Sequence, residues 1–120
     1  MDIIFLRELA VETVIGIYDW ERVTRQTVSI DLEMAADIRP AAASDDIADT
    51  LDYKAVAKRV IAFVGDSRFH LIEALAESVA TILREEFGIA WVRVTVRKPG
   101  AIRGARDVGV RIERGAAAAQ

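Results

Sequence analysis

The sequence contains no cysteine and only one histidine, His70, among its 120 residues. The lack of cysteine excludes disulfide bonds and metal sites built from thiolates. A single histidine leaves too few ligands for a transition-metal site. A glycine-rich phosphate loop and a Ser-His-Asp set are also missing, so two common kinds of functional site have no basis here. We therefore expect no metal and look for chemistry that needs none.

The first residues, Met1 to Ile4, carry no basic leader, and no long apolar segment follows them. Neither a signal peptide nor a membrane span is expected from this pattern. We expect a cytoplasmic protein with no membrane partner. An apolar fraction of 52% and a charged fraction of 29% are typical of a globular protein. The length fits one domain over residues 1–115, followed by a flexible tail of small residues over 116–120.

The net charge of −3 hides an asymmetry along the chain. Residues 1–52 carry 12 acidic and 4 basic side chains, whereas residues 53–120 carry 7 acidic and 12 basic ones. Four cations, Arg97, Lys98, Arg103 and Arg106, precede Asp107 without an intervening acid. This group is too small for a nucleic-acid surface, so no nucleic-acid partner is expected. A phosphate or carboxylate site, a solvated loop and a set of inter-subunit ion pairs all remain open.

Alternating apolar and polar residues predict strands over 27–34, 92–97 and 108–113. Residues 3–17 are also rich in strand formers, with a bend at Gly16, and residues 19–22 form a polar connection to the second strand. Residues 40–49 predict a loop. Apolar residues at helical spacing predict helices over 52–65 and 70–87, and Gly88 stops the second helix.

This order of elements, β-β-α-α-β-β, predicts an α+β fold in which a four-stranded antiparallel sheet carries two helices on one face. The polar face of the sheet is expected to meet water, and it carries Asp31, Glu33, Arg93, Thr95 and Arg111. An open sheet also leaves unpaired edges, and symmetric self-association is one way to cover them. We therefore expect a homo-oligomer.

Two charged residues lie where a solvated surface would not place them by default. Glu73 follows His70 by three residues at the start of an apolar helix, so it either closes a capping box or binds a flat guanidine-like group through paired N–H bonds. Lys98 shares the parity of Val92, Val94 and Val96. It either points towards the covered face, where it could transfer protons, or snorkels outward from a strand that ends at Arg97.

Other polar residues have plain structural alternatives. Tyr53 is either an aromatic staple at the helix start or a stacking residue with a titratable hydroxyl. Glu21 is a solvated loop acid on the simplest interpretation, and His70 is a helix cap. The acidic group at 45–52 lacks the glycine and closing glutamate of a calcium loop, so capping of the first helix is favoured. That group comprises Asp45, Asp46, Asp49 and Asp52.

Five short motifs, taken together, resemble the dihydroneopterin aldolase family over nearly the whole chain. The motifs stand in the family's order and at its spacing, and they are Gly16–Glu21 (GIYDWE), Asp49–Tyr53 (DTLDY), Leu71–Glu77 (LIEALAE), Lys98–Ala101 (KPGA) and Val108–Val110 (VGV). The resemblance implies the tunnelling fold, in which such units form tetrameric rings that commonly stack into octamers. Active sites then lie between neighbouring subunits.

The resemblance also implies a reaction of folate biosynthesis. The family cleaves 7,8-dihydroneopterin into 6-hydroxymethyl-7,8-dihydropterin and glycolaldehyde, without a cofactor, a metal or a lysine Schiff base. By resemblance, Glu73 anchors the pterin and Lys98 is the main acid–base group. Glu21 positions Lys98 or a water, and Tyr53 of the adjacent subunit stacks on the pterin and relays a proton. Backbone groups of Leu51, Asp52 and Ile72 complete the pterin pocket.

Two other functions remain open at this point. A 2′-epimerase acting on dihydroneopterin or its triphosphate uses the same retro-aldol step followed by re-addition, so one site can also support both activities. Arg103 and Arg106 would suit a triphosphate tail, whereas the KPGA motif at Lys98 favours the aldolase. A ring protein that binds pterin without catalysis is the third possibility.

Overall fold

A computed structural model describes residues 1–116, and these residues form a four-stranded antiparallel sheet with the strand order β1-β2-β3-β4. The strands are β1 (Ile3–Thr13), β2 (Gln26–Ala35), β3 (Trp91–Pro99) and β4 (Asp107–Gly115). The predicted α+β class and strand positions are confirmed. The last three strands extend slightly beyond their predicted bounds, and the first ends four residues before its predicted end. Of the predicted tail over 116–120, residues 117–120 lie outside the described residues.

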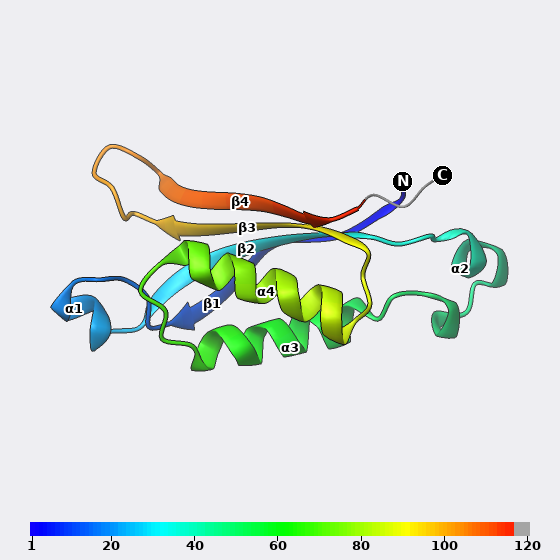
Figure 1. Ribbon diagram of the computed structural model, residues 1–120, viewed down its shortest axis with the longest axis horizontal. Coiled ribbons are helices and arrows are strands. Elements are labelled where there is room, and N and C mark those ends of the chain that lie inside the picture. The colour runs from blue at the N-terminus through cyan, green and yellow to red at the C-terminus, as the bar shows by residue number, and fades with distance from the viewer. Residues whose placement is uncertain (117–120) are drawn as a thin grey trace.

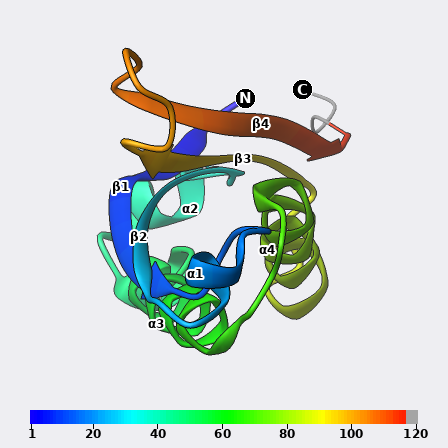
Figure 2. The ribbon, with the colours of Figure 1, turned by 90° about the vertical axis from the view of Figure 1, so that its left-hand side faces the viewer.

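Two antiparallel helices, α3 (Tyr53–Asp66) and α4 (Ile72–Glu86), cover one face of the sheet (Figure 1). The end-on view shows the sheet curving around them from β4 to β1 (Figure 2). Asp52 caps α3, because its Oδ1 accepts a hydrogen bond of 3.0 Å from the Ala55 N–H. The helix therefore begins where the sequence predicts it, at the change from acidic to apolar spacing.

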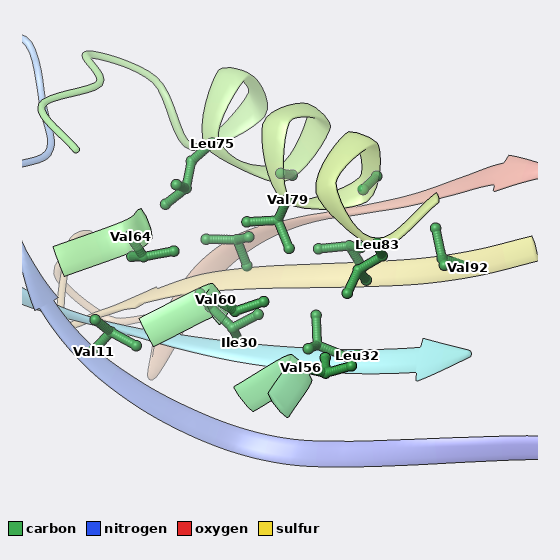
Figure 3. Close-up of a cluster of buried hydrophobic side chains, with 14 of the residues drawn as sticks. Val11, Ile30, Leu32, Val56, Val60, Val64, Leu75, Val79, Leu83 and Val92 are labelled. Carbon is green, nitrogen blue, oxygen red and sulfur yellow. The ribbon is translucent and has the colours of Figure 1, made fainter. Parts of the chain in front are cut away.

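The core lies between the helices and the sheet (Figure 3). Each helix presents apolar residues four positions apart, and each central strand presents every second residue. The buried residues at these positions include Val56, Val60 and Val64 of α3, Leu75, Val79 and Leu83 of α4, Ile30 and Leu32 of β2, and Val92, Val94 and Val96 of β3. This packing fixes the start of α4 against the end of β3, and the candidate site lies there.

The opposite face of the sheet carries no helix and is crossed by ion pairs. Arg97 contacts Asp31 at 2.8 Å, and Arg93 contacts Glu33 at 3.2 Å. Thr95 was expected to meet water but is only 5% exposed, because the Arg111 side chain lies over it and donates a hydrogen bond of 3.0 Å to its hydroxyl. Paired charges therefore replace water on much of this face.

The predicted loop over 40–49 is wrong. Its residues form a short helix, α2 (Arg39–Ser44), and a 3-10 turn, η1 (Ile47–Asp49). Pro40 suits the first turn of a helix and the alanines that follow are strong helix formers, so the local preference is helical. Asp46 caps η1 by accepting from the Ala48 N–H at 2.9 Å. The capping of the first predicted helix is therefore confirmed at Asp52, whereas Asp46 caps a turn that was not predicted.

Within residues 1–116, no helix combines the length and the apolar character that crossing a bilayer would require.

Candidate active site

A cavity of about 360 Å³ opens at one end of the molecule, where a short helix, α1 (Asp19–Arg22), meets the start of α4 and the β3–β4 connection. Figures 1 and 2 show these three segments at the same end of the fold. Four of the predicted site residues line the cavity, namely Glu21, Ile72, Glu73 and Lys98. Segments far apart in sequence therefore converge on one recess.

Lys98 and Glu21 form an ion pair on one wall of the cavity. The Lys98 Nζ lies 2.7 Å from the Glu21 Oε2, and the two side chains are only 16% and 6% exposed. The outward alternative for Lys98 is wrong, because β3 continues to Pro99 and keeps Lys98 on the covered face. Glu21 is likewise no solvated loop acid, since a one-turn helix holds it in the interior.

Three donors fix the Glu21 carboxylate. Besides Lys98, the Gln26 side-chain amide donates to Oε2 at 3.0 Å and the Tyr18 N–H donates to Oε1 at 3.3 Å. Burial by itself raises the pKa of Glu21, but the hydrogen bonds from Lys98, Gln26 and Tyr18 outweigh it and lower the pKa from 4.5 to about 2. Glu21 is therefore a carboxylate at neutral pH.

Gly16 leaves room for this carboxylate. Its φ of +124° lies in a region that L-residues rarely adopt, and a Cβ at this position would collide with the Glu21 carboxyl group. Glycine at the predicted bend therefore also allows the Glu21 carboxylate to lie against the backbone, because Gly16 has no side chain.

The lowered pKa of Glu21 predicts a loss of stability in acid. The folded protein keeps this group ionised where the unfolded chain would take up a proton, so the stabilisation is present above pH 4.5 and is lost as the pH falls towards about 2. It amounts to at most about 3 kcal/mol. Thermal unfolding measured between about pH 6 and pH 3 is expected to show a smaller decrease in Tm for Glu21→Gln than for the wild type. Equal decreases would contradict this assignment.

The wall opposite the ion pair comes from the start of α4. Leu71 is the N-cap, has an extended backbone and supplies no side-chain cap, so the predicted cap at His70 and the capping box for Glu73 are wrong. Glu73 occupies the second position of the helix instead, with an exposed side chain on the cavity wall. First-turn N–H groups lack partners within a helix. Glu73 therefore lies on the cavity wall in a turn whose backbone N–H groups have no partner within the helix.

The structure does not bring Leu51, Asp52 or Tyr53 to this cavity. They lie at the start of α3, and α3 is about 20 Å long at a rise of 1.5 Å per residue. Figure 1 accordingly shows the start of α3 on the side of the molecule away from α1, towards α2. Tyr53 is 49% exposed, so its interpretation as a core staple is wrong. Within one chain, Tyr53 therefore does not line the cavity that contains Lys98.

Gln26 is a cavity residue that sequence reasoning missed. Its amide nitrogen joins two acceptors, the Ile15 carbonyl at 2.7 Å and the Glu21 carboxylate. The sequence places it at the edge of a predicted strand, where glutamine carries no signal of its own. The role of Gln26 follows from the buried position of Glu21, because the Gln26 amide donates a hydrogen bond to that carboxylate.

The chain is similar to known proteins over nearly its whole length. The chain matches the family model described as FolB, dihydroneopterin aldolase, over residues 4–113. It is 50% identical to the dihydroneopterin aldolase of Escherichia coli K12 over 115 residues, which cover 96% of this chain and 94% of that protein. The crystal structure of the E. coli dihydroneopterin aldolase in complex with neopterin superposes with a TM-score of 0.93, covering 96% of this chain and all of that one.

A related enzyme is more distant. The dihydroneopterin triphosphate 2′-epimerase of E. coli K12 is 34% identical over 108 residues, covering 90% of each chain. The paired acid and base in a small recess define an enzyme that moves protons on a small molecule. The chain belongs to the dihydroneopterin aldolase family. It is an aldehyde-lyase of folate biosynthesis, and the resemblance stated from its five motifs is confirmed.

Proposed function

We propose that the Lys98–Glu21 pair and the Glu73 carboxylate carry out the retro-aldol cleavage of 7,8-dihydroneopterin from opposite walls of the cavity. The observation that supports this assignment is the buried ion pair of 2.7 Å facing the same recess as an exposed acid in the first turn of α4. The first group is suited to proton transfer, and the second is suited to holding a heterocycle with N–H donors.

The chemistry requires little from the protein beyond position and protons. A base removes the proton of the 2′ hydroxyl, and the C1′–C2′ bond breaks as glycolaldehyde forms. The electron pair moves into the ring imine next to C1′, so the ring itself is the electron sink. An acid protonates the imine nitrogen as the enamine forms. C1′ then takes up a proton while the ring N–H gives its proton back, which restores the ring imine of the product. Lys98, alone or through a water, is the group that serves these steps.

Glu21 supports Lys98 in this proposal. Its low pKa keeps a negative charge beside Lys98, and its three donors prevent it from turning away. A fixed carboxylate of this kind orients the lysine and any water that bridges to the substrate. Gln26 holds Glu21 in place.

Glu73 anchors the pterin in this proposal. The 2-amino group and the adjacent ring N–H form a flat pair of donors that matches the two oxygens of a carboxylate. Backbone groups of Ile72 line the same wall. Leu51, Asp52 and Tyr53 complete the pocket from a neighbouring subunit, with Tyr53 stacking on the ring and relaying a proton.

A head-to-tail ring supports the contribution of that neighbour. The start of α3 and the cavity are separate surfaces of one chain. A heterologous contact is one way to join them, and repeated contacts of this kind form a ring when the rotation between subunits closes. Large apolar residues are exposed on both surfaces, with Tyr18, Trp20 and Leu71 near the cavity and Ile47 and Tyr53 near the start of α3. We propose a homo-tetramer that stacks into an octamer, with its active sites between subunits.

Subunit mixing tests the shared site. Tyr53→Ala and Lys98→Ala chains are each expected to have little activity alone. When equal amounts are denatured together and reassembled, about one quarter of the sites recover both wild-type residues in a heterologous ring. Assays of kcat before and after mixing check this result. No recovery from mixed rings of the correct mass would contradict a site shared between chains.

The two-substrate assay tests the reaction itself. Purified protein is incubated with 7,8-dihydroneopterin and, separately, with its triphosphate, and the products are separated by chromatography. We expect glycolaldehyde and 6-hydroxymethyl-7,8-dihydropterin from the first substrate only, with the 2′-epimer as a minor product. The epimerase alternative has one supporting feature, the exposed Arg103 and Arg106 on the β3–β4 connection beside the cavity. Epimerisation of the triphosphate without cleavage of dihydroneopterin would favour it.

A further inference from the structure

The two walls of the cavity are held together by an arginine that does not line it. Arg22, the last residue of α1, donates through one nitrogen to the Gly16 carbonyl at 2.9 Å and to the Phe69 carbonyl at 3.0 Å. Its second terminal nitrogen donates to the Arg68 carbonyl at 2.6 Å. Arg68 reciprocates with a hydrogen bond of 3.0 Å to the Arg22 carbonyl.

These bonds connect two segments of the chain that few other hydrogen bonds join. One is the turn from Gly16 to Arg22, which carries Glu21. The other is the connection between α3 and α4, which leads within four residues of Phe69 to Glu73 on the opposite wall. Among the described residues, the backbone hydrogen bond between these segments, from the Gly16 N–H to the Phe69 carbonyl, is long at 3.3 Å. The Arg22 side chain therefore donates two of the four hydrogen bonds between these segments, and its third bond, to the Gly16 carbonyl, fixes the turn itself.

A planar guanidinium is suited to this task. Its donors point in fixed directions, so it can hold several carbonyls in one geometry, whereas an ammonium group cannot define their relative orientation. Bonds from a charged donor are also stronger than those between neutral groups. Because Leu71 supplies no side-chain cap, the start of α4 depends on such contacts with the preceding connection.

We propose that Arg22 is a positioning residue that sets the separation between the pterin-anchoring wall at Glu73 and the proton-transferring wall at Lys98 and Glu21. This inference rests on the proposed function. Arg22 touches neither Glu73 nor Lys98, and it acts through the carbonyls of the connection. When Arg22 is lost, the start of α4 shifts, while Glu21 keeps its hydrogen bonds from Gln26 and Lys98.

Arg25 provides a matched control. It also donates to backbone carbonyls, to Glu12 at 2.6 Å and to Gly65 at 3.2 Å, and it likewise ties the segment before β2 to the end of α3. Neither Arg25 nor either of its acceptors lines the cavity, and Arg25 donates to none of the carbonyls of residues 68–73. Arg25→Ala therefore reports the general cost of losing an arginine bonded to carbonyls.

The experiment compares Arg22→Ala, Arg22→Lys and Arg25→Ala with the wild type in the full-length assembled protein. The readouts are Tm, kcat and KM with 7,8-dihydroneopterin, and the Kd for neopterin measured by fluorescence. For Arg22→Ala we expect kcat/KM to fall about 10- to 100-fold, because a displacement of the order of 1 Å has such an effect. The loss is expected mainly in KM, with a parallel rise in the Kd for neopterin. Arg22→Lys is expected to lie between Arg22→Ala and the wild type.

Arg25→Ala is expected to lower Tm by a similar amount with kcat/KM changed by no more than about twofold. Unaltered neopterin binding in Arg22→Ala, or an equal loss in Arg25→Ala, would overturn the proposal. If Arg22→Ala does not fold, Arg22→Lys decides, and a Kd equal to that of the wild type would overturn it. The Kd for neopterin can be measured without turnover. An inactive wild type would therefore refute the proposed function, and the effect of Arg22 on pterin binding could still be measured.

Discussion

Replacing Lys98 with alanine is expected to lower kcat for the cleavage of 7,8-dihydroneopterin by about 100- to 10,000-fold, the usual contribution of a positioned acid or base. Pterin binding should change little, because Lys98 lies on the wall opposite the proposed anchor. The ratio of kcat to KM therefore falls mainly through kcat. Steady-state kinetics, together with the Kd for neopterin, separate the two effects.

The substitution also leaves the Glu21 carboxylate without its cation, and a stranded buried charge destabilises a protein by about 3–5 kcal/mol. Lys98→Gln is the matched control, since its amide can still donate a hydrogen bond to Glu21 but cannot transfer a proton as an ammonium group does. We expect Lys98→Gln to be nearly as inactive as Lys98→Ala and clearly more stable. An active Lys98→Gln enzyme would show that Lys98 serves only to hold Glu21 through a hydrogen bond and not to transfer protons. Pterin binding with no turnover in the wild type, unchanged in Lys98→Ala, would instead support a non-catalytic ring protein.

Replacing Glu73 with alanine is expected to weaken pterin binding more than any other single change at the cavity. A charge-assisted contact made through two parallel hydrogen bonds contributes on the order of 2–4 kcal/mol. The Kd for neopterin and the KM for 7,8-dihydroneopterin should therefore rise roughly 30- to 700-fold. Direct binding and initial-rate measurements check both values. An unaltered KM would contradict the anchor assignment.

Glu77 offers a control for this substitution. It lies one turn further along α4, pairs with Arg114 at 2.9 Å on the surface, and does not line the cavity. Glu77→Ala removes the same charge from the same helix without touching the pterin wall. Surface pairs of this kind contribute little to stability. We therefore expect neopterin binding and Tm close to those of the wild type.

The fold was largely predictable because its signals are local. Val92, Val94 and Val96 alternate with polar residues, which defines both the strand and the face that turns inward. The same alternation places Lys98 on the covered face of the sheet, because the strand continues past Arg97 to Pro99. Asp52 marks the start of α3 because an acid before an apolar helical stretch is a common cap.

The site was less predictable because its contacts are distant in sequence. Lys98 and Glu21 lie 77 residues apart, and nothing near Glu21 indicates that a one-turn helix buries it. The cap of α4 was placed one position too early, at His70, since the helix begins after Leu71, a residue type that rarely serves as a cap. The helix start depends on backbone contacts between Phe69 and the turn at Gly16, which only the folded chain brings together.

The most direct test of the central claim is a crystal structure of the assembled protein with 6-hydroxymethyl-7,8-dihydropterin bound. We expect the 2-amino group and the ring N–H to donate to the two oxygens of Glu73. The ring imine nitrogen and the 6-hydroxymethyl group should lie within hydrogen-bonding reach of Lys98 or of a water that it holds. A pterin ring bound away from Glu73, or turned so that its imine faces away from Lys98, would contradict this account.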